Sequence, residues 1–242
     1  MDTRIDEIAD GIFRLSTLVP EVNPPSGFTF NQFLIRAEQP MLVHLGHRKM
    51  FPRIAAAVAK LLPVGALQHL AYSHAEADEC GALDAWLDAA TQATVAHTAV
   101  GCQIWLGDAA SRPPRKMADN EVIDLGGKRV RFLATPHVPH GWDAQLFFEE
   151  TTATLMCSDI LGHPGDGPAI VETDLVERVI EGEKRSRSMS LTPATAPTLR
   201  RLAALKPQRL ALMHGSSFAG DAGGALTRLA DHFAATLRAE AA

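Results

Sequence analysis

The sequence predicts an α/β fold in which two β-sheets pack together and helices cover their outer faces. Strand-like and helix-like segments mix through both halves of the chain, and no linker separates the halves. Side chains of His and Asp also follow the ends of several predicted strands, as is common in α/β folds. The chain has 242 residues, enough to bury a sizeable core. We therefore expect one domain over residues 1–242.

The first half of the chain begins with strands. Residues 28–46 read as two strands joined by the polar turn AEQP, and residues 50–62 have helical spacing and Ala-rich propensity. The predicted elements of this half are strands at 11–19, 28–36, 41–46, 67–73 and 93–97, helices at 50–62 and 79–90, and a helical turn at 100–106.

The second half begins with two hairpins, the first turned at Gly126-Gly127. Amphipathic helices then flank one more apolar strand. The predicted elements are hairpins at 121–136 and 144–159, helices at 171–186 and 195–207, a strand at 209–215 and a final helix at 224–242.

Composition excludes several classes of protein. The chain carries 23 basic and 28 acidic residues, and its densest basic run, EKRSRS at 183–188, is too weak to bind nucleic acid. No apolar stretch is long enough to span a membrane, and the acidic N-terminus is unlike a signal peptide. The cysteines Cys80, Cys102 and Cys157 show no CxxC spacing, so we expect reduced thiols in a cytoplasmic protein.

Polar clusters follow four predicted strands. His74 ends the run LQHLAYSH, Asp159 follows ATLMCS, His214 follows RLALM, and His140 lies in the loop HVPHGWD. Strand ends in an α/β fold tend to gather at one edge of the sheet, so we expect these side chains to converge.

The segment SHAEADE places His74, Glu76 and Asp78 at alternate positions. Imidazole and carboxylate groups at this density either bind metal or repel one another, and a carboxylate such as Asp159 has two oxygens with which to bridge two ions. The alternative is an acidic helix N-terminus, which accounts for Glu79 but not for His74. A metal-free binding module would leave buried carboxylates unpaired.

These residues resemble the metallo-β-lactamase superfamily, whose signature is His-x-x-x-Asp with a second ligand between. The form His-x-Glu-x-Asp, together with HGWD at 140–143, CSDILGHPG at 157–165 and LMHGSSF at 212–218, is similar to the diiron domain of flavodiiron proteins. The resemblance covers roughly residues 8–240 and implies an αββα sandwich of two mixed sheets. No segment resembles a flavodoxin domain or an FMN site.

The resemblance implies two non-haem iron ions. One would be bound by His74, Glu76 and His140, the other by Asp78 and His214, with Asp159 bridging them. Oxygen-rich ligation without thiolate favours iron or manganese over zinc. His137 is the alternative to His140, Glu79 is either a helix-start residue or an extra oxygen donor, and His163 is a candidate partner behind a ligand. His44 stands where the superfamily commonly has Asp.

The function that this resemblance implies is the binding or reduction of O2 or NO. Electrons would come from a separate flavodoxin- or rubredoxin-like donor, and without a donor the protein would act as an oxygen sensor or carrier. A homodimer is compatible with the resemblance. The alternative is a dinuclear hydrolase of esters, thioesters, lactones or phosphodiesters, in which the metals lower the pKa of a bridging water.

Overall fold

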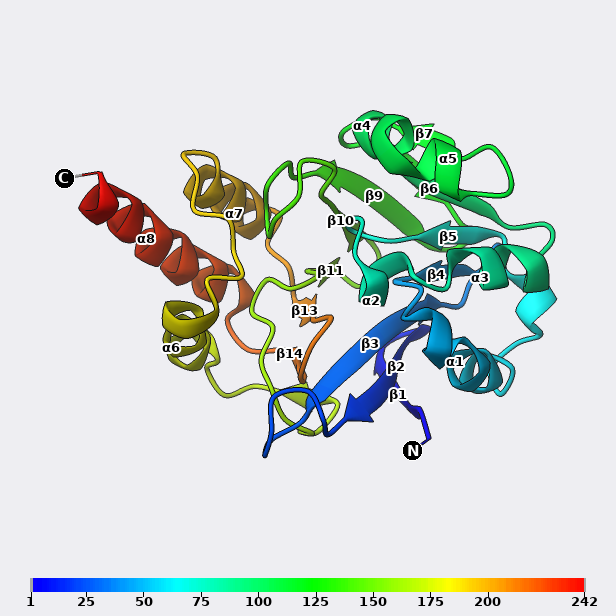
Figure 1. Ribbon diagram of the computed structural model, residues 1–242, viewed down its shortest axis with the longest axis horizontal. Coiled ribbons are helices and arrows are strands. Elements are labelled where there is room, and N and C mark those ends of the chain that lie inside the picture. Colours follow the sequence, from blue (N-terminus) through cyan, green and yellow to red (C-terminus); the bar gives the residue numbers. More distant parts are fainter. Residues whose placement is uncertain (1, 242) are drawn as a thin grey trace.

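Two seven-stranded mixed sheets pack face to face in the computed structural model, which describes residues 2–241 (Figure 1). The predicted α/β fold with helices outside is confirmed. The first sheet has the strand order β1-β2-β3-β4-β5-β6-β7, antiparallel as far as β4 and parallel beyond it. Its strands are β1 (Arg4–Ala9), β2 (Ile12–Val19), β3 (Phe28–Ile35), β4 (Met41–Val43), β5 (His69–Ala71), β6 (Thr94–Thr98) and β7 (Arg115–Met117).

The second sheet has the order β12-β14-β13-β11-β10-β9-β8. Its hairpins β8–β9 and β10–β11 are the two that the sequence predicts, while β11 and β13 run parallel. The strands are β8 (Val122–Asp124), β9 (Arg129–Ala134), β10 (Gln145–Glu149), β11 (Thr154–Met156), β12 (Ile170–Val171), β13 (Arg209–Ala211) and β14 (Ser217–Phe218).

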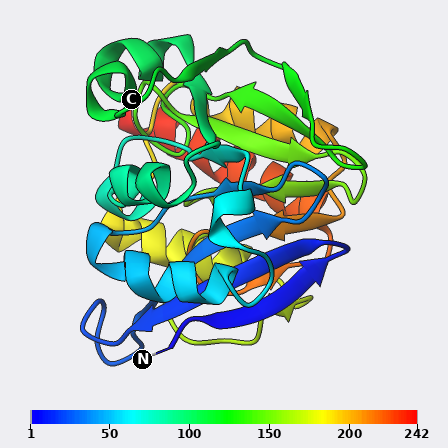
Figure 2. The ribbon, with the colours of Figure 1, turned by 90° about the vertical axis from the view of Figure 1, so that its right-hand side faces the viewer.

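The helices form two groups on opposite sides of the sheets. Figure 2 shows the first group in front of the strands and α8 behind them. The first group is α1 (Phe51–Val58), α2 (Ala77–Cys80), α3 (Leu83–Ala89), α4 (Ala99–Gly101) and α5 (Gly107–Ala109), with a π-helical turn over Cys102–Leu106. The second is α6 (Val176–Ser186), α7 (Thr195–Ala204) and α8 (Ala222–Glu240). Within residues 2–241, no helix is both long and apolar enough to cross a membrane.

Strand β3 shows why the central strands carry large apolar side chains on both faces. Phe33 and Ile35 point into the cluster between the sheets, whereas Phe30 and Leu34 join the cluster beneath the first group of helices. A third cluster lies between the second sheet and α6–α8. Alternate side chains of a strand point to opposite faces, so a strand that is covered on both sides needs no polar face.

Two predicted helices begin or break elsewhere. The helix expected at 79–90 is two short helices, because the N–H of Ala82 donates to the Gly46 carbonyl (2.9 Å) across the fold. The helix expected from residue 171 starts at Val176, whose N–H donates to the Asp174 carboxylate (2.9 Å). The final helix begins at Ala222 and ends at Glu240, and residue 242 of the prediction lies outside the described residues.

Candidate metal centre

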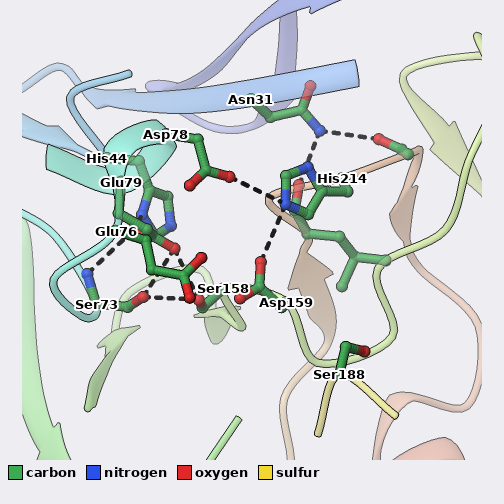
Figure 3. Close-up of polar contacts among 12 residues, drawn as sticks. Asn31, His44, Ser73, Glu76, Asp78, Glu79, Ser158, Asp159, Ser188 and His214 are labelled. Carbon is green, nitrogen blue, oxygen red and sulfur yellow. Dashed lines mark hydrogen bonds and ion pairs between the residues drawn. The ribbon is translucent and has the colours of Figure 1, made fainter. Parts of the chain in front are cut away.

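Six side chains from both sheets meet at one edge of the sandwich. His74, Glu76 and Asp78 follow β5 of the first sheet and lead into α2. The others come from the second sheet: His140 lies between β9 and β10, and Asp159 and His214 follow β11 and β13. Met156 pairs with Ala211 in those parallel strands, so Asp159 and His214 each lie three residues beyond a paired position. The parallel register therefore brings these two side chains together (Figure 3).

Asp159 lies between two groups of side chains. Its Oδ1 is 3.1 Å from Nε2 of His214, which is also 3.4 Å from Oδ2 of Asp78. Its Oδ2 is 3.5 Å from Nε2 of both His74 and His140. Glu76 faces the same two histidines, at 3.7 Å and 3.0 Å respectively. The two oxygens of Asp159 thus point to different sides of the site.

The other ring nitrogen of each histidine fixes its tautomer. Nδ1 of His214 is 2.9 Å from the Thr29 carbonyl, and Nδ1 of His140 is 2.9 Å from the Ser188 carbonyl. A carbonyl oxygen only accepts hydrogen bonds, so both Nδ1 atoms carry a proton. In the neutral rings the Nε2 lone pairs then point at the carboxylates, which is the arrangement of metal-binding histidines.

The site has an excess of negative charge that raises the pKa values of its histidines. Burial opposes protonation of His74, yet Glu76, Glu79 and Asp159 raise its pKa to about 9. Burial likewise opposes protonation of His214, but Asp159 and Asp78 raise its pKa to about 10. The pKa of Glu76 is lowered, chiefly by His140 and His74. Either bound protons or metal cations can therefore balance these carboxylates.

Unsatisfied atoms favour a metal ion over hydrogen bonds. Within the described part of the chain, Nε2 of His74, Nε2 of His140 and Oδ1 of Asp159 are buried without a hydrogen-bond partner. Ligand atoms of His74, His140 and Asp159 all lie within 4.8 Å of one another, and this group could hold a metal ion. The residues present therefore fit a metal-binding site.

Comparison with known proteins supports the same conclusion. A family model described as "ODP family beta lactamase" matches residues 28–215. The chain belongs to the ODP family. Within this family of metallo-β-lactamase-like domains, the match extends from β3 to the glycine after His214 and so includes all six side chains of the site.

Similar proteins are flavoproteins and flavodiiron proteins. "Putative diflavin flavoprotein A 1" of Thermosynechococcus vestitus is 32% identical over 140 residues, which is 57% of this chain but only 24% of that relative. The flavodiiron protein of Giardia intestinalis has a TM-score of 0.80 at 16% identity, covering 96% of this chain and 60% of the other. Rubredoxin oxygen:oxidoreductase from Desulfovibrio gigas has a TM-score of 0.77 at 18% identity, covering 94% and 62%. These structures share the fold of the ODP domain.

The structure separates the two histidines of HVPH. His140 lies beside Glu76, whereas His137 is exposed and adopts a left-handed backbone conformation with φ of 66°. The backbone N–H of His137 donates to the Gly141 carbonyl (2.7 Å), which closes the loop that carries His140. His137 therefore serves the turn and does not reach the site.

His163 supports the His214 loop from behind. Its Nδ1 donates to the Leu161 carbonyl (3.1 Å), and its Nε2 accepts from the N–H of Ser216 (3.1 Å). Its ring packs against Gly215, which has φ of 84° and where an added Cβ would overlap the imidazole. The backbone N–H of His163 also donates to the His214 carbonyl (3.3 Å), so His163 holds the backbone that carries His214.

Glu79 and His44 form a buried pair that the sequence analysis did not foresee. Glu79 is in α2, fully buried, and accepts from Nδ1 of His44. Burial disfavours its charge, but His44 and His74 hold the pKa of Glu79 below its ordinary value. His44 therefore has an acidic partner, Glu79.

Proposed function

We propose that the six side chains bind two non-haem iron ions. His74, Glu76 and His140 would hold one ion, Asp78 and His214 would hold the other, and Asp159 would bind both. The observation that carries this proposal is Glu76, a carboxylate that faces two imidazoles across the site. Three carboxylates, three imidazoles and no thiolate make a hard donor set, which suits iron or manganese better than zinc.

The two oxygens of Asp159 support two ions rather than one. Oδ1 faces His214 and Asp78, and Oδ2 faces His74 and His140. The carbonyls of Thr29 and Ser188 keep two of these imidazoles in the tautomer that offers Nε2. Glu76 is half exposed, which leaves one side of the site open to a small ligand.

We infer that the ligand is O2 or NO. When bound, a ferrous pair held by these six side chains would supply electrons to O2, or two electrons to two NO molecules, which with two protons would give N2O and water. Reduction of O2 to water needs four electrons and two ferrous ions supply two, so turnover requires an external donor. The name of the similar Desulfovibrio gigas protein, a rubredoxin oxygen:oxidoreductase, supports a rubredoxin- or flavodoxin-like donor. Without a donor, the protein would serve as a sensor or carrier.

We propose that residues 1–242 act as one domain. Both sheets contribute to the central apolar cluster, and both supply side chains to the site. Each sheet supplies only part of the proposed ligand set, so the site needs both sheets.

An anaerobic reaction with O2 tests the function. The iron-loaded protein is reduced chemically, O2 or NO is admitted, and the visible spectrum is recorded. A diiron protein gives a ferric charge-transfer band, and reduced rubredoxin or flavodoxin speeds its decay if the protein is a reductase. Asp159→Ala serves as the variant without the site, and His137→Ala as the matched control that keeps it.

The same sample is screened with esters, thioesters, lactones and phosphodiesters. A protein that is spectrally silent toward O2 and NO, yet cleaves one of these substrates at enzymatic rates, would contradict the proposed function. The site would then be a dinuclear hydrolase.

A further inference from the structure

Glu79 accepts four hydrogen bonds beneath the site. Its Oε1 is 2.8 Å from the hydroxyl of Ser73 and 2.8 Å from the hydroxyl of Ser158. Its Oε2 accepts from Nδ1 of His44 and from the N–H of Ser73 (3.2 Å). A carboxylate has about four acceptor positions, so these donors use its full capacity. Glu79 is therefore not available as an extra ligand.

Glu79 and the two serines are each adjacent in the sequence to a proposed ligand. Ser73 precedes His74 at the end of β5, Ser158 precedes Asp159 at the end of β11, and Glu79 follows Asp78 in α2. Figure 3 shows Glu79, Ser73 and Ser158 side by side. β5 belongs to the first sheet and β11 to the second. One carboxylate therefore connects three ligand-bearing segments across the sandwich.

The direction of the hydrogen bonds sets the tautomer of His74. Ser73 Oγ lies 2.8 Å from Oε1 of Glu79, 2.6 Å from Oγ of Ser158 and 2.8 Å from Nδ1 of His74. With its one hydroxyl proton on the side of Glu79, Ser73 Oγ accepts from Nδ1 of His74. His74 then offers Nε2, which has no hydrogen-bond partner among the described residues. Ser158 adopts φ of 52°, and its carbonyl also accepts from the N–H of Met213 (3.0 Å), beside His214.

We propose that Glu79 is a positioning residue that orients His74 through Ser73 and Asp159 through Ser158. This inference rests on the proposed metal ligands. A carboxylate behind a histidine ligand fixes its ring and makes it a stronger electron donor, and here a serine hydroxyl carries that effect. Nδ1 of His44 donates to the same carboxylate, which is fully buried and would otherwise have one hydrogen-bond donor fewer.

Cobalt binding to the metal-free full-length chain tests this role. Co²⁺ alone is titrated against a competing chelator in the wild type, Ser73→Ala, Ser158→Ala and Glu79→Gln. We expect each variant to bind Co²⁺ about 10- to 100-fold more weakly than the wild type. Glu149→Gln is the matched control, because Glu149 is also a buried carboxylate and accepts from Thr151 and Thr152, which follow β10. It should keep wild-type affinity.

Proton NMR of the cobalt-loaded protein gives a second readout. The ring N–H protons of metal-bound histidines are strongly shifted and visible when they are protected from exchange. Three such signals are expected in the wild type, for His74, His140 and His214. Ser73→Ala and Glu79→Gln should lose the signal of His74 and keep the other two, which a general loss of stability would not do.

Wild-type affinity and three ring signals in both Ser73→Ala and Glu79→Gln would overturn the proposal. If Glu79→Gln does not fold, the Co²⁺ affinities of Ser73→Ala and Ser158→Ala test the proposal, because both variants keep the Glu79 carboxylate. A wild type that binds no Co²⁺ would overturn the ligand set and this inference with it. A wild type that binds Co²⁺ as expected but fails to react with O2 or NO when loaded with iron would overturn only the proposed function.

Discussion

At the scale of single residues, Asp159 has the central position in the site, because its two oxygens face different histidines. Asp159→Ala should lose both metals, since two cations would then face each other without a bridging carboxylate. His74→Ala and His214→Ala should each weaken mainly one metal. Elemental analysis after gel filtration measures the outcome, with exposed His137→Ala as the control. Loss of metal in His137→Ala with retention in His140→Ala would reverse the assignment within HVPH.

Metal binding should also release protons. The pKa of His74 is raised to about 9 and that of His214 to about 10, so both rings are protonated in the metal-free protein at pH 8. Metal needs the neutral imidazole, and filling the site should therefore release about two protons per chain at pH 8. A pH indicator in weak buffer measures the release, and His214→Ala should release about one proton fewer. No release in the wild type would show that these rings are already neutral.

The sequence singled out the six side chains that the structure brings together, but not the residues that contact them. His74, Glu76, Asp78, His140, Asp159 and His214 stand out because charged and imidazole groups follow apolar strands, and the structure brings them together. Ser73, Ser158 and Thr29 show no such signal. Serine and threonine occur everywhere, and their roles depend on contacts between segments far apart in the sequence.

At the scale of elements, the start of α8 is set by a side-chain cap. Asp221 accepts from the N–H of Gly224 (2.9 Å), which satisfies one of the free donors of the first turn. Asp221→Ala should lower the free energy of unfolding by about 1 kcal/mol. Urea denaturation of the metal-free protein measures it, and Glu240→Ala at the exposed end of the same helix is the control. Equal stability of both variants would show that this cap contributes nothing.

Element boundaries were harder to predict than element types. Hairpins β8–β9 and β10–β11 follow from local turn residues and apolar strands. The break between α2 and α3 depends on the carbonyl of Gly46, which lies more than thirty positions earlier in the chain. The short strands β7, β12 and β14 have two or three residues each, too few for a periodic pattern.

At the scale of the whole molecule, the contact between the sheets holds the two halves of the site together. Phe147 in β10 is fully buried in the apolar cluster between the sheets, which also contains Phe33 of β3, and its ring packs edge-on against Phe132 at 5.0 Å between centroids. Phe147→Ala should lower the free energy of unfolding by about 3–5 kcal/mol, because it leaves a cavity between the sheets. Trp142, which is 62% exposed, is the matched control, and Trp142→Ala should change stability by less than about 0.5 kcal/mol. Similar losses in both variants would contradict a core that spans both sheets.

The overall architecture was predictable because alternation of strands and helices in both halves leaves few ways to bury the apolar faces. The pairing of β11 with β13, which brings Asp159 beside His214, was not predictable from local pattern. Those strands are separated by more than fifty residues, and only the finished sheet sets their register.

The metal content of the protein tests the central claim most directly. The full chain is produced in iron-replete cells, purified without chelators or an affinity metal, and analysed for iron, manganese and zinc per chain. Since the proposed donor set is three imidazoles and three carboxylates, we predict close to two iron ions per chain and little zinc. Two zinc ions and no iron would contradict the diiron assignment and favour a hydrolase.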